Sequence, residues 1–220
     1  MKQIAHAALS RSSSTVQSGC DGFDCSSGRI LMTDVALHGD IGFVLVVHRR
    51  RDGLVAEEIY CALRDSDGTW QEPDHLSGGL VGIDPQVARD VQDALRGETM
   101  TGISYAESLV YTGRFGGDDG YESVRFLEVL TAPRIDHIEV ADRDRTGASA
   151  TRKPTPHALS ILVAFPEERL LLRTGSDGSV IHFDGAGGVA DDEPGALSCD
   201  TGLFRPRPEP SSRRRGEWLG

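Results

Sequence analysis

The alternation of hydrophobic and polar residues indicates a β-rich body between residues 30 and 184. Apolar residues recur with period two where one face of a strand is buried, and they run without interruption where both faces are covered. One uninterrupted run extends from Phe43 to Val47, which predicts a strand covered on both sides. The whole pattern predicts strands at 30–37, 41–49, 55–64, 104–112, 121–130, 135–140, 159–165, 169–173 and 180–183, with a further strand beginning at Trp70.

Two Asp-Gly pairs mark tight turns between predicted strands, because this pair tolerates the positive φ that short hairpins need. Asp67-Gly68 precedes the strand that begins at Trp70, and Asp177-Gly178 predicts a hairpin of 170–173 with 180–183. Polar stretches rich in glycine or proline separate other strands. We therefore expect loops at 72–83 and 142–156.

A single amphipathic helix is predicted at about 84–96. Asp84 is a favourable N-cap residue, and Pro85 suits the first helical position. Apolar residues then follow at helical spacing, from Val87 through Val91 to Leu95. Gly97 is typical of the position just after a helix.

These elements predict a mainly β fold, with an antiparallel sandwich or barrel-like sheets, one helix and disordered termini. Residues 1–29, rich in serine and glycine, are expected to be a disordered flank, and residues 30–184 to be the folded body. Pro133 is a possible boundary, which would split the body into 30–132 and 134–184. Residues 185–220, acidic and then rich in proline and arginine, are expected to be a disordered tail.

The charge distribution argues against nucleic acid as a ligand of the body. The net charge of the chain is −11, and the charges of the two flanks cancel, so the body carries all of it. An acidic surface repels a phosphate backbone. The three arginines at 213–215 are a weak indication of polyanion binding by the tail.

The sequence also predicts a soluble, cytoplasmic protein. No stretch approaches the length needed to span a membrane, and the apolar residues at 4–9 are too few for a signal-peptide core. Without a secreted context, the four cysteines are expected to be free thiols (Cys20, Cys25, Cys61 and Cys199). Because Met32 stands where the strand pattern begins, residues 1–31 are also compatible with an extension ahead of the true start.

Two short motifs are similar to functional sites, and both lack an essential part. Residues 102–106, around Ser104, are similar to a nucleophile elbow, but the last glycine is alanine and no helix is predicted after the serine. Residues 142–147 match the opening of a calcium loop, but the twelfth position holds Lys153 where a bidentate glutamate is required. We therefore interpret the first as a strand and the second as a solvated loop.

The remaining polar residues give no stronger signal. Asp118 and Asp119 lie in a glycine-rich segment that turn formation explains. The pair Cys20 and Cys25 has no second pair to complete a zinc site. Residues 185–188 are glycine-rich but precede no helix, so they do not form a phosphate loop. The histidines show no metal-binding spacing (His6, His38, His48, His75, His137, His157 and His182).

We therefore expect a non-catalytic β-rich module that binds a partner protein or contributes to an assembly. The oppositely charged flanks and the proline-rich segment 205–210 suit docking to a partner. No catalytic residue, metal site or cofactor is predicted, and the binding residues are unknown. One alternative is an enzyme or small-ligand binder whose site is built from distant loops, around His75, 116–120 and 143–156. Another is an acidic regulatory or immunity-type protein that blocks a basic partner.

Overall fold

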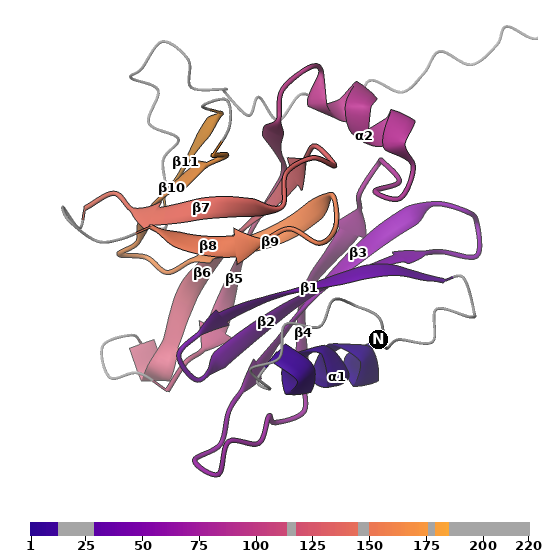
Figure 1. Cartoon of the computed structure of the whole chain (residues 1–220). Helices are drawn as coiled ribbons and strands as arrows, with labels where there is room; N and C mark the ends of the chain where they lie inside the picture. The colour runs from indigo at the N-terminus through magenta and orange to yellow at the C-terminus, as the bar shows by residue number, and fades with distance from the viewer. Residues whose placement is uncertain (13–28, 114–117, 145–149, 176–178, 185–220) are drawn as a thin grey trace, which may run out of the picture.

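The computed structural model describes residues 1–12, 29–113, 118–144, 150–175 and 179–184. Within these ranges the chain is mainly β, with three antiparallel sheets and two α-helices (Figure 1). The predicted fold class is therefore confirmed. The expectations for residues 13–28 and 185–220 lie outside the described residues.

The first sheet is a meander of four strands that follow one another in the sequence. Its order is β1 (Ile30–His38), β2 (Ile41–Arg49), β3 (Val55–Leu63) and β4 (Asp74–Leu80). The apolar run of β2 is buried from Ile41 to Val47, as the sequence predicts for a strand covered on both faces. β2 therefore forms the centre of this sheet.

The second and third sheets are interleaved along the chain. The second has the order β5 (Met100–Tyr111), β6 (Tyr121–Thr131) and β9 (Leu159–Ala164). The third has the order β11 (Val180–Asp184), β10 (Arg169–Arg173), β7 (His137–Asp142) and β8 (Thr151–Pro154). The chain thus leaves the second sheet after β6 and forms β7 and β8 in the third sheet. It then returns to the second sheet, where β9 pairs with β6, so strands on the two sides of Pro133 belong to one sheet.

Three hydrophobic cores hold these layers together. The largest lies between the first and second sheets, where Phe43 and Phe126 meet edge to face with ring centroids 5.5 Å apart. The second sheet buries its other face, including Leu127 and Val129, against the third sheet. The period-two alternation of β6 therefore serves two cores, because successive side chains point to opposite faces.

Helix α1 (Lys2–Ser12) covers the outer face of the first sheet, and it corrects the prediction of a disordered flank for these residues (Figure 1). Ala5 and Leu9 are fully buried against Val44 and Val46. The His6 ring also lies 3.1 Å from the carbonyl oxygen of Trp70. The helix thus supplies the cover that the outer side of β2 requires.

Gly42 on β2 makes room for Leu9 of this helix. A Cβ atom at Gly42 would overlap the Leu9 side chain and would lie 2.9 Å from the Trp70 ring. We expect Gly42→Ala to lower the free energy of unfolding by about 1–3 kcal/mol, the usual cost of overpacking a core. Gly175→Ala is the matched control, because nothing lies within 4 Å of a Cβ atom there. Urea unfolding measures both variants, and equal losses would contradict this account of α1.

Helix α2 (Ala88–Leu95) is shorter at its start than the sequence predicts. Asp84 does not cap it: its side chain accepts a hydrogen bond from the Gln86 N–H (3.0 Å) and forms an ion pair with Arg49. Val87 is the N-cap residue and has extended backbone angles. The predicted end is confirmed, because the C-cap residue Arg96 has left-handed backbone angles and Gly97 follows it with a φ of +93°.

Two predicted loops contain strands, and one predicted strand is a single bridge. β4 lies within 72–83 and β8 within 142–156, so both loop predictions are wrong over those residues. Trp70 forms only an isolated bridge with Arg64. The predicted hairpin is confirmed, since Leu170 pairs with Phe183 and Arg173 with Val180.

Candidate functional site

The face of β5 and β6 that packs in part against the third sheet also carries a stripe of exposed aromatic and aliphatic side chains, which we call the β5–β6 stripe: Tyr105, Leu109, Tyr111 and Tyr121. The side chains are 44–66% exposed, with Leu109 the most exposed of them. Tyr111 and Tyr121 are directly paired across the two strands, with ring centroids 5.2 Å apart. At the other end Tyr105 contacts Phe183 of β11. Exposed apolar patches of this kind mark interaction surfaces more often than chance.

The charges beside the β5–β6 stripe are paired with one another. Glu107 accepts a hydrogen bond from Ser123 and one from Arg125 (3.2 Å). These hydrogen bonds and the Arg125 charge lower the pKa of Glu107. The Arg125 guanidinium also lies 5.9 Å from the centre of the Tyr105 ring. The surface is therefore apolar and close to neutral, although the body as a whole is acidic.

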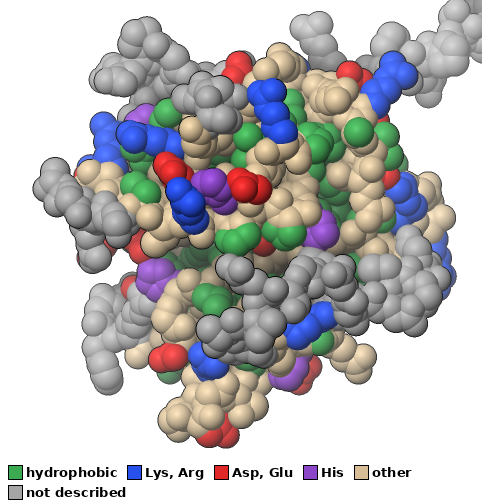
Figure 2. Space-filling model, in the orientation of Figure 1, with side chains coloured by type: hydrophobic (Ala, Val, Ile, Leu, Met, Phe, Trp, Pro, Cys, Tyr) green, Lys and Arg blue, Asp and Glu red, His purple; other side chains and the backbone are tan. Residues whose placement is uncertain are grey.

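A cleft of about 370 Å³ opens between α2 and the ends of β6 and β8. The buried residues Met32 and Val91 line it, as do Pro85, Pro133 and Pro156. Hydrophobic side chains gather beside α2 on the face drawn in Figure 2. We call this the α2 cleft.

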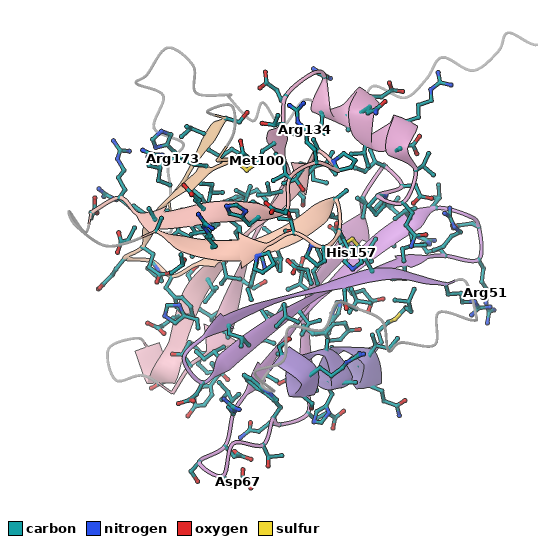
Figure 3. The ribbon with its side chains drawn as sticks, in the orientation of Figure 1. Arg51, Asp67, Met100, Arg134, His157 and Arg173 are labelled. Carbon is teal, nitrogen blue, oxygen red and sulfur yellow. The ribbon has the colours of Figure 1, made fainter. Side chains whose placement is uncertain are left out.

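His157 brings an imidazole to the α2 cleft. It precedes β9, and Figure 3 shows it near the centre of the molecule, beside β1. Burial lowers the pKa of His157, against a smaller opposite effect of the Asp34 carboxylate. The imidazole is therefore neutral at physiological pH, and a neutral imidazole offers one donor and one acceptor nitrogen.

Near His157, a buried carboxylate joins all three sheets. The Oδ2 atom of Asp34 on β1 accepts a hydrogen bond from the Ile161 N–H on β9 (2.7 Å) and forms an ion pair with the Lys153 ammonium on β8 (2.9 Å). The Lys153 Nζ atom also donates to the Val35 carbonyl (3.0 Å). Lys153, which stands where a calcium loop would need a glutamate, thus pairs with the buried Asp34 carboxylate.

Two glutamates meet in the core between the first and second sheets. Glu57 on β3 and Glu128 on β6 are 8% and 2% exposed, and their carboxyl groups are hydrogen-bonded to each other. Burial, this hydrogen bond and the negative charge of Glu57 raise the pKa of Glu128 to about 10. Glu128 is therefore protonated at neutral pH.

A second, more open groove of about 480 Å³ crosses the outer face of the first sheet. His48 and Glu58 approach within 3.1 Å there, and Tyr60 donates a hydrogen bond to the same carboxylate. Burial, this hydrogen bond and the Glu58 charge raise the pKa of Tyr60. His75, which the sequence names in a candidate loop and which lies in β4, also lines the groove, as does Gly78.

The structure separates the other residues that the sequence singled out. Ser104 lies inside β5, with no helix after it, so the elbow geometry is absent. Asp119 lies in a 3₁₀ turn (Asp118–Gly120) with a φ of +55° and does not line the α2 cleft. Cys61 is a buried free thiol, and burial with the Asp74 charge raises its pKa to about 12. Cys20, Cys25 and Cys199, and the glycines at 185–188, lie outside the described residues.

Metal binding has no support in the part of the chain that the structure describes. There, no three His, Cys, Asp or Glu side chains are grouped so that they could hold an ion. None of the helices in the same ranges is long and apolar enough to cross a membrane.

Comparisons with known protein families, with curated proteins and with solved structures find no match to this chain. Function is therefore argued from the surfaces and cavities of the molecule alone.

Proposed function

We propose that the protein is a non-catalytic β-rich module that binds a partner protein by adding a strand of the partner to the open edge of β5. The observation that supports this proposal is the edge position of β5 combined with the β5–β6 stripe. Among the described strands only β6 is hydrogen-bonded to β5. An edge strand presents a row of backbone groups that can pair with another chain.

Three of the other edge strands, β1, β8 and β9, are protected by devices that β5 lacks. The Asp34 carboxylate of β1 accepts a hydrogen bond from the Ile161 N–H of β9, so this edge group of β9 is already paired. β8 has four residues, carries two positive charges and ends at Pro154. Short edges, charges and proline are the usual means of blocking strand addition. The register of β5 shifts between Gly102 and Ser104, and from there to Tyr111 the strand has no proline and one charged residue, Glu107.

The side chains of β5 suit recognition of an extended segment. Tyr105, Leu109 and Tyr111 project from one face of β5, and Glu107 lies on the same face between Tyr105 and Leu109. In strand addition the backbone hydrogen bonds give affinity, while side chains on alternate positions give specificity. Aromatic residues are also enriched at the centres of protein interfaces. The expected partner segment is therefore extended, with apolar side chains on one face.

A photoreactive phenylalanine analogue at position 109 tests this proposal in cells of the native source. We expect irradiation to join position 109 to one defined partner, identified by mass spectrometry. The same analogue at Leu80, an exposed residue of β4, is the matched control and should not give that adduct. If the adduct contained a second copy of this chain, the partner would be the protein itself and the module would contribute to a homo-oligomeric assembly. The proposal fails if position 109 gives no adduct or the same adducts as position 80.

Tyr111→Lys supplies the affinity test once the partner is known. We expect this change to weaken binding at least about tenfold, which corresponds to about 1.4 kcal/mol, because it places a charge in the apolar contact and protects the edge. Tyr111 is half exposed, so the fold should be unchanged, which circular dichroism verifies. Isothermal titration calorimetry measures the affinity, and unchanged binding would place the partner elsewhere.

A further inference from the structure

The groove on the outer face of the first sheet, which we call the outer groove, has the dimensions of a small-molecule site. Its volume of about 480 Å³ falls within the range of ligand pockets, roughly 300–1,000 Å³. Residues of β2, β3 and β4 line it, and these strands are hydrogen-bonded side by side. The outer groove is therefore part of the sheet itself and is formed before a ligand arrives.

The strand register gives the order of side chains along the outer groove. One row across the three strands consists of His48, Ala56 and Leu80. The next row on the same face contains Glu58 and Gly78, which are paired. His75 reaches this second row, since its Nε2 atom lies 3.3 Å from the position of a Cβ atom at Gly78. Arg50 lies beyond the first row, because its N–H bonds to the Leu54 carbonyl, two residues before Ala56.

Both acidic residues of the outer groove have partners within the chain. The Glu58 Oε1 atom lies 3.1 Å from His48 Nε2, and Glu58 Oε2 accepts a hydrogen bond from the Tyr60 hydroxyl. The Glu57 side chain belongs to the opposite face of β3, where its carboxyl group is hydrogen-bonded to Glu128. The outer groove therefore has no carboxylate to spare for a cationic ligand.

The polar groups that remain in the outer groove are nitrogen donors. His75 is exposed, and among the described residues neither of its ring nitrogens has a hydrogen-bond or ion-pair partner. Its ring only contacts Tyr60, with centroids 5.3 Å apart. The Arg50 NH2 atom lies 3.0 Å from Asp52, and a guanidinium has five N–H donors, so others stay available. Such groups suit the oxygens of a carboxylate or phosphate.

Positive charge also gathers at the Arg50 end of the outer groove. Three arginines follow one another at 49–51, and Arg29 joins them through its carbonyl, which accepts a hydrogen bond from the Arg49 N–H (2.6 Å). Figure 3 shows Arg51 at this edge of the molecule. Asp52 and Asp84 form ion pairs with this group, so its positive charges exceed its negative ones. A local excess of one sign raises the concentration of ligands of the opposite sign.

From this geometry we propose that the outer groove binds a small, elongated organic anion. Its carboxylate or phosphate contacts Arg50, its apolar middle covers Ala56 and Leu80, and an acceptor at its far end takes a hydrogen bond from His75. Leu80 is 53% exposed, so covering it removes apolar surface from water. The outer groove lies on the first sheet and the β5–β6 stripe on the second, so a failure of either proposal leaves the other standing.

Binding of 4-acetyl-2-fluorobenzoate and 4-acetyl-2-fluorophenyl phosphate to the full chain, followed by ¹⁹F NMR at low salt, tests the proposal. We expect saturable shifts, and binding at least about tenfold weaker for the uncharged methyl ester of the benzoate. The tighter of the two anions identifies the acid group of the ligand. Leu80→Glu should weaken both at least about tenfold, because it places a negative charge in the groove. Leu37→Glu is the matched control, since Leu37 is 48% exposed on the same sheet and does not line the groove.

Variants of the two nitrogen donors test the orientation of the ligand. Arg50→Gln should remove most of the preference for the benzoate over its ester, whereas Arg51→Gln, at an exposed neighbour that does not line the groove, should keep it. His75→Ala should weaken the acetyl probe about fivefold and leave 4-ethyl-2-fluorobenzoate, which lacks the acceptor, unchanged. His182→Ala, at an exposed strand residue elsewhere, should change neither.

Thermal unfolding of each variant shows that its fold is intact. The proposal is overturned if neither anion binds saturably, or if the ester binds as tightly as the benzoate. It is also overturned if Leu80→Glu binds like Leu37→Glu, or if Arg50→Gln behaves like Arg51→Gln.

Discussion

Replacing Glu128 with glutamine is expected to make the stability of the protein much less sensitive to rising pH. In the folded chain, burial and the Glu57 carboxylate raise the pKa of Glu128 from 4.5 to about 10. In the unfolded chain the same carboxyl group loses its proton near its ordinary pKa, so unfolding releases one proton between these two values. Because the folded state binds the additional proton, stability falls as pH rises, by up to about 1.4 kcal/mol per pH unit.

The measurement is the free energy of unfolding in urea between about pH 5.5 and pH 8.5, where the effect of this proton accumulates to about 4 kcal/mol. Glu128→Gln keeps the shape of the side chain and donates a hydrogen bond to Glu57 without a titratable proton. The free energy of unfolding of this variant should not show the fall with rising pH that Glu128 causes in the wild type. Glu98→Gln, an exposed glutamate after α2, is the control and should keep the wild-type slope. Identical slopes for the Glu128 and Glu98 variants would contradict the paired state of Glu57 and Glu128.

The second large effect is expected from Asp34→Ala, which should lower the free energy of unfolding by about 3–5 kcal/mol. The change removes the counter-charge of Lys153, whose side chain is only 15% exposed, and the acceptor of the buried Ile161 N–H. Removing one partner of a buried pair leaves the other charge uncompensated. The loss also loosens the contact of β1 with β9, so all three sheets are affected.

Urea unfolding of single and double variants isolates the contribution of the Asp34–Lys153 ion pair to stability. Lys153→Met in the Asp34→Ala background should recover part of the loss, since no buried ammonium then remains without its partner. Asp52→Ala breaks an ion pair with Arg50 that is about half exposed, and it should cost no more than about 1 kcal/mol. If Asp34→Ala lowered the free energy of unfolding no more than Asp52→Ala does, the contacts of Asp34 with Lys153 and Ile161 would not stabilise the fold.

The strands that were predictable carry hydrophobic patterns that only a sheet explains. The uninterrupted run of β2 and the alternation of β6 are of this kind, and both are buried on two faces. β4 could not be recognised, because Gly78 and Gly79 are typical of turns. Residues 2–12 were missed because α1 buries little more than Ala5, Ala8 and Leu9, a surface too small to stand out in a polar flank.

The candidate sites were less accessible to sequence reasoning than the fold. Three residues that line the α2 cleft, Met32, Val91 and His157, lie more than fifty residues apart, and no local motif links them. Glu128 could be assigned to the same face as Phe126, but a glutamate in an alternating strand normally indicates solvent. Its burial follows from the approach of Glu57 on another sheet. The edge position of β5 likewise depends on strand order, which the hydrophobic pattern does not contain.

The return of the chain from β8 to β9 has a practical consequence for work with fragments. A unit that is to be expressed alone, or exchanged in a chimera, needs a cut that leaves every sheet whole. Any cut between β6 and β9 takes a neighbour from β6, and any cut between β8 and β10 divides the last sheet. From β5 onward the chain is therefore indivisible, and modular engineering has to treat that stretch as one piece.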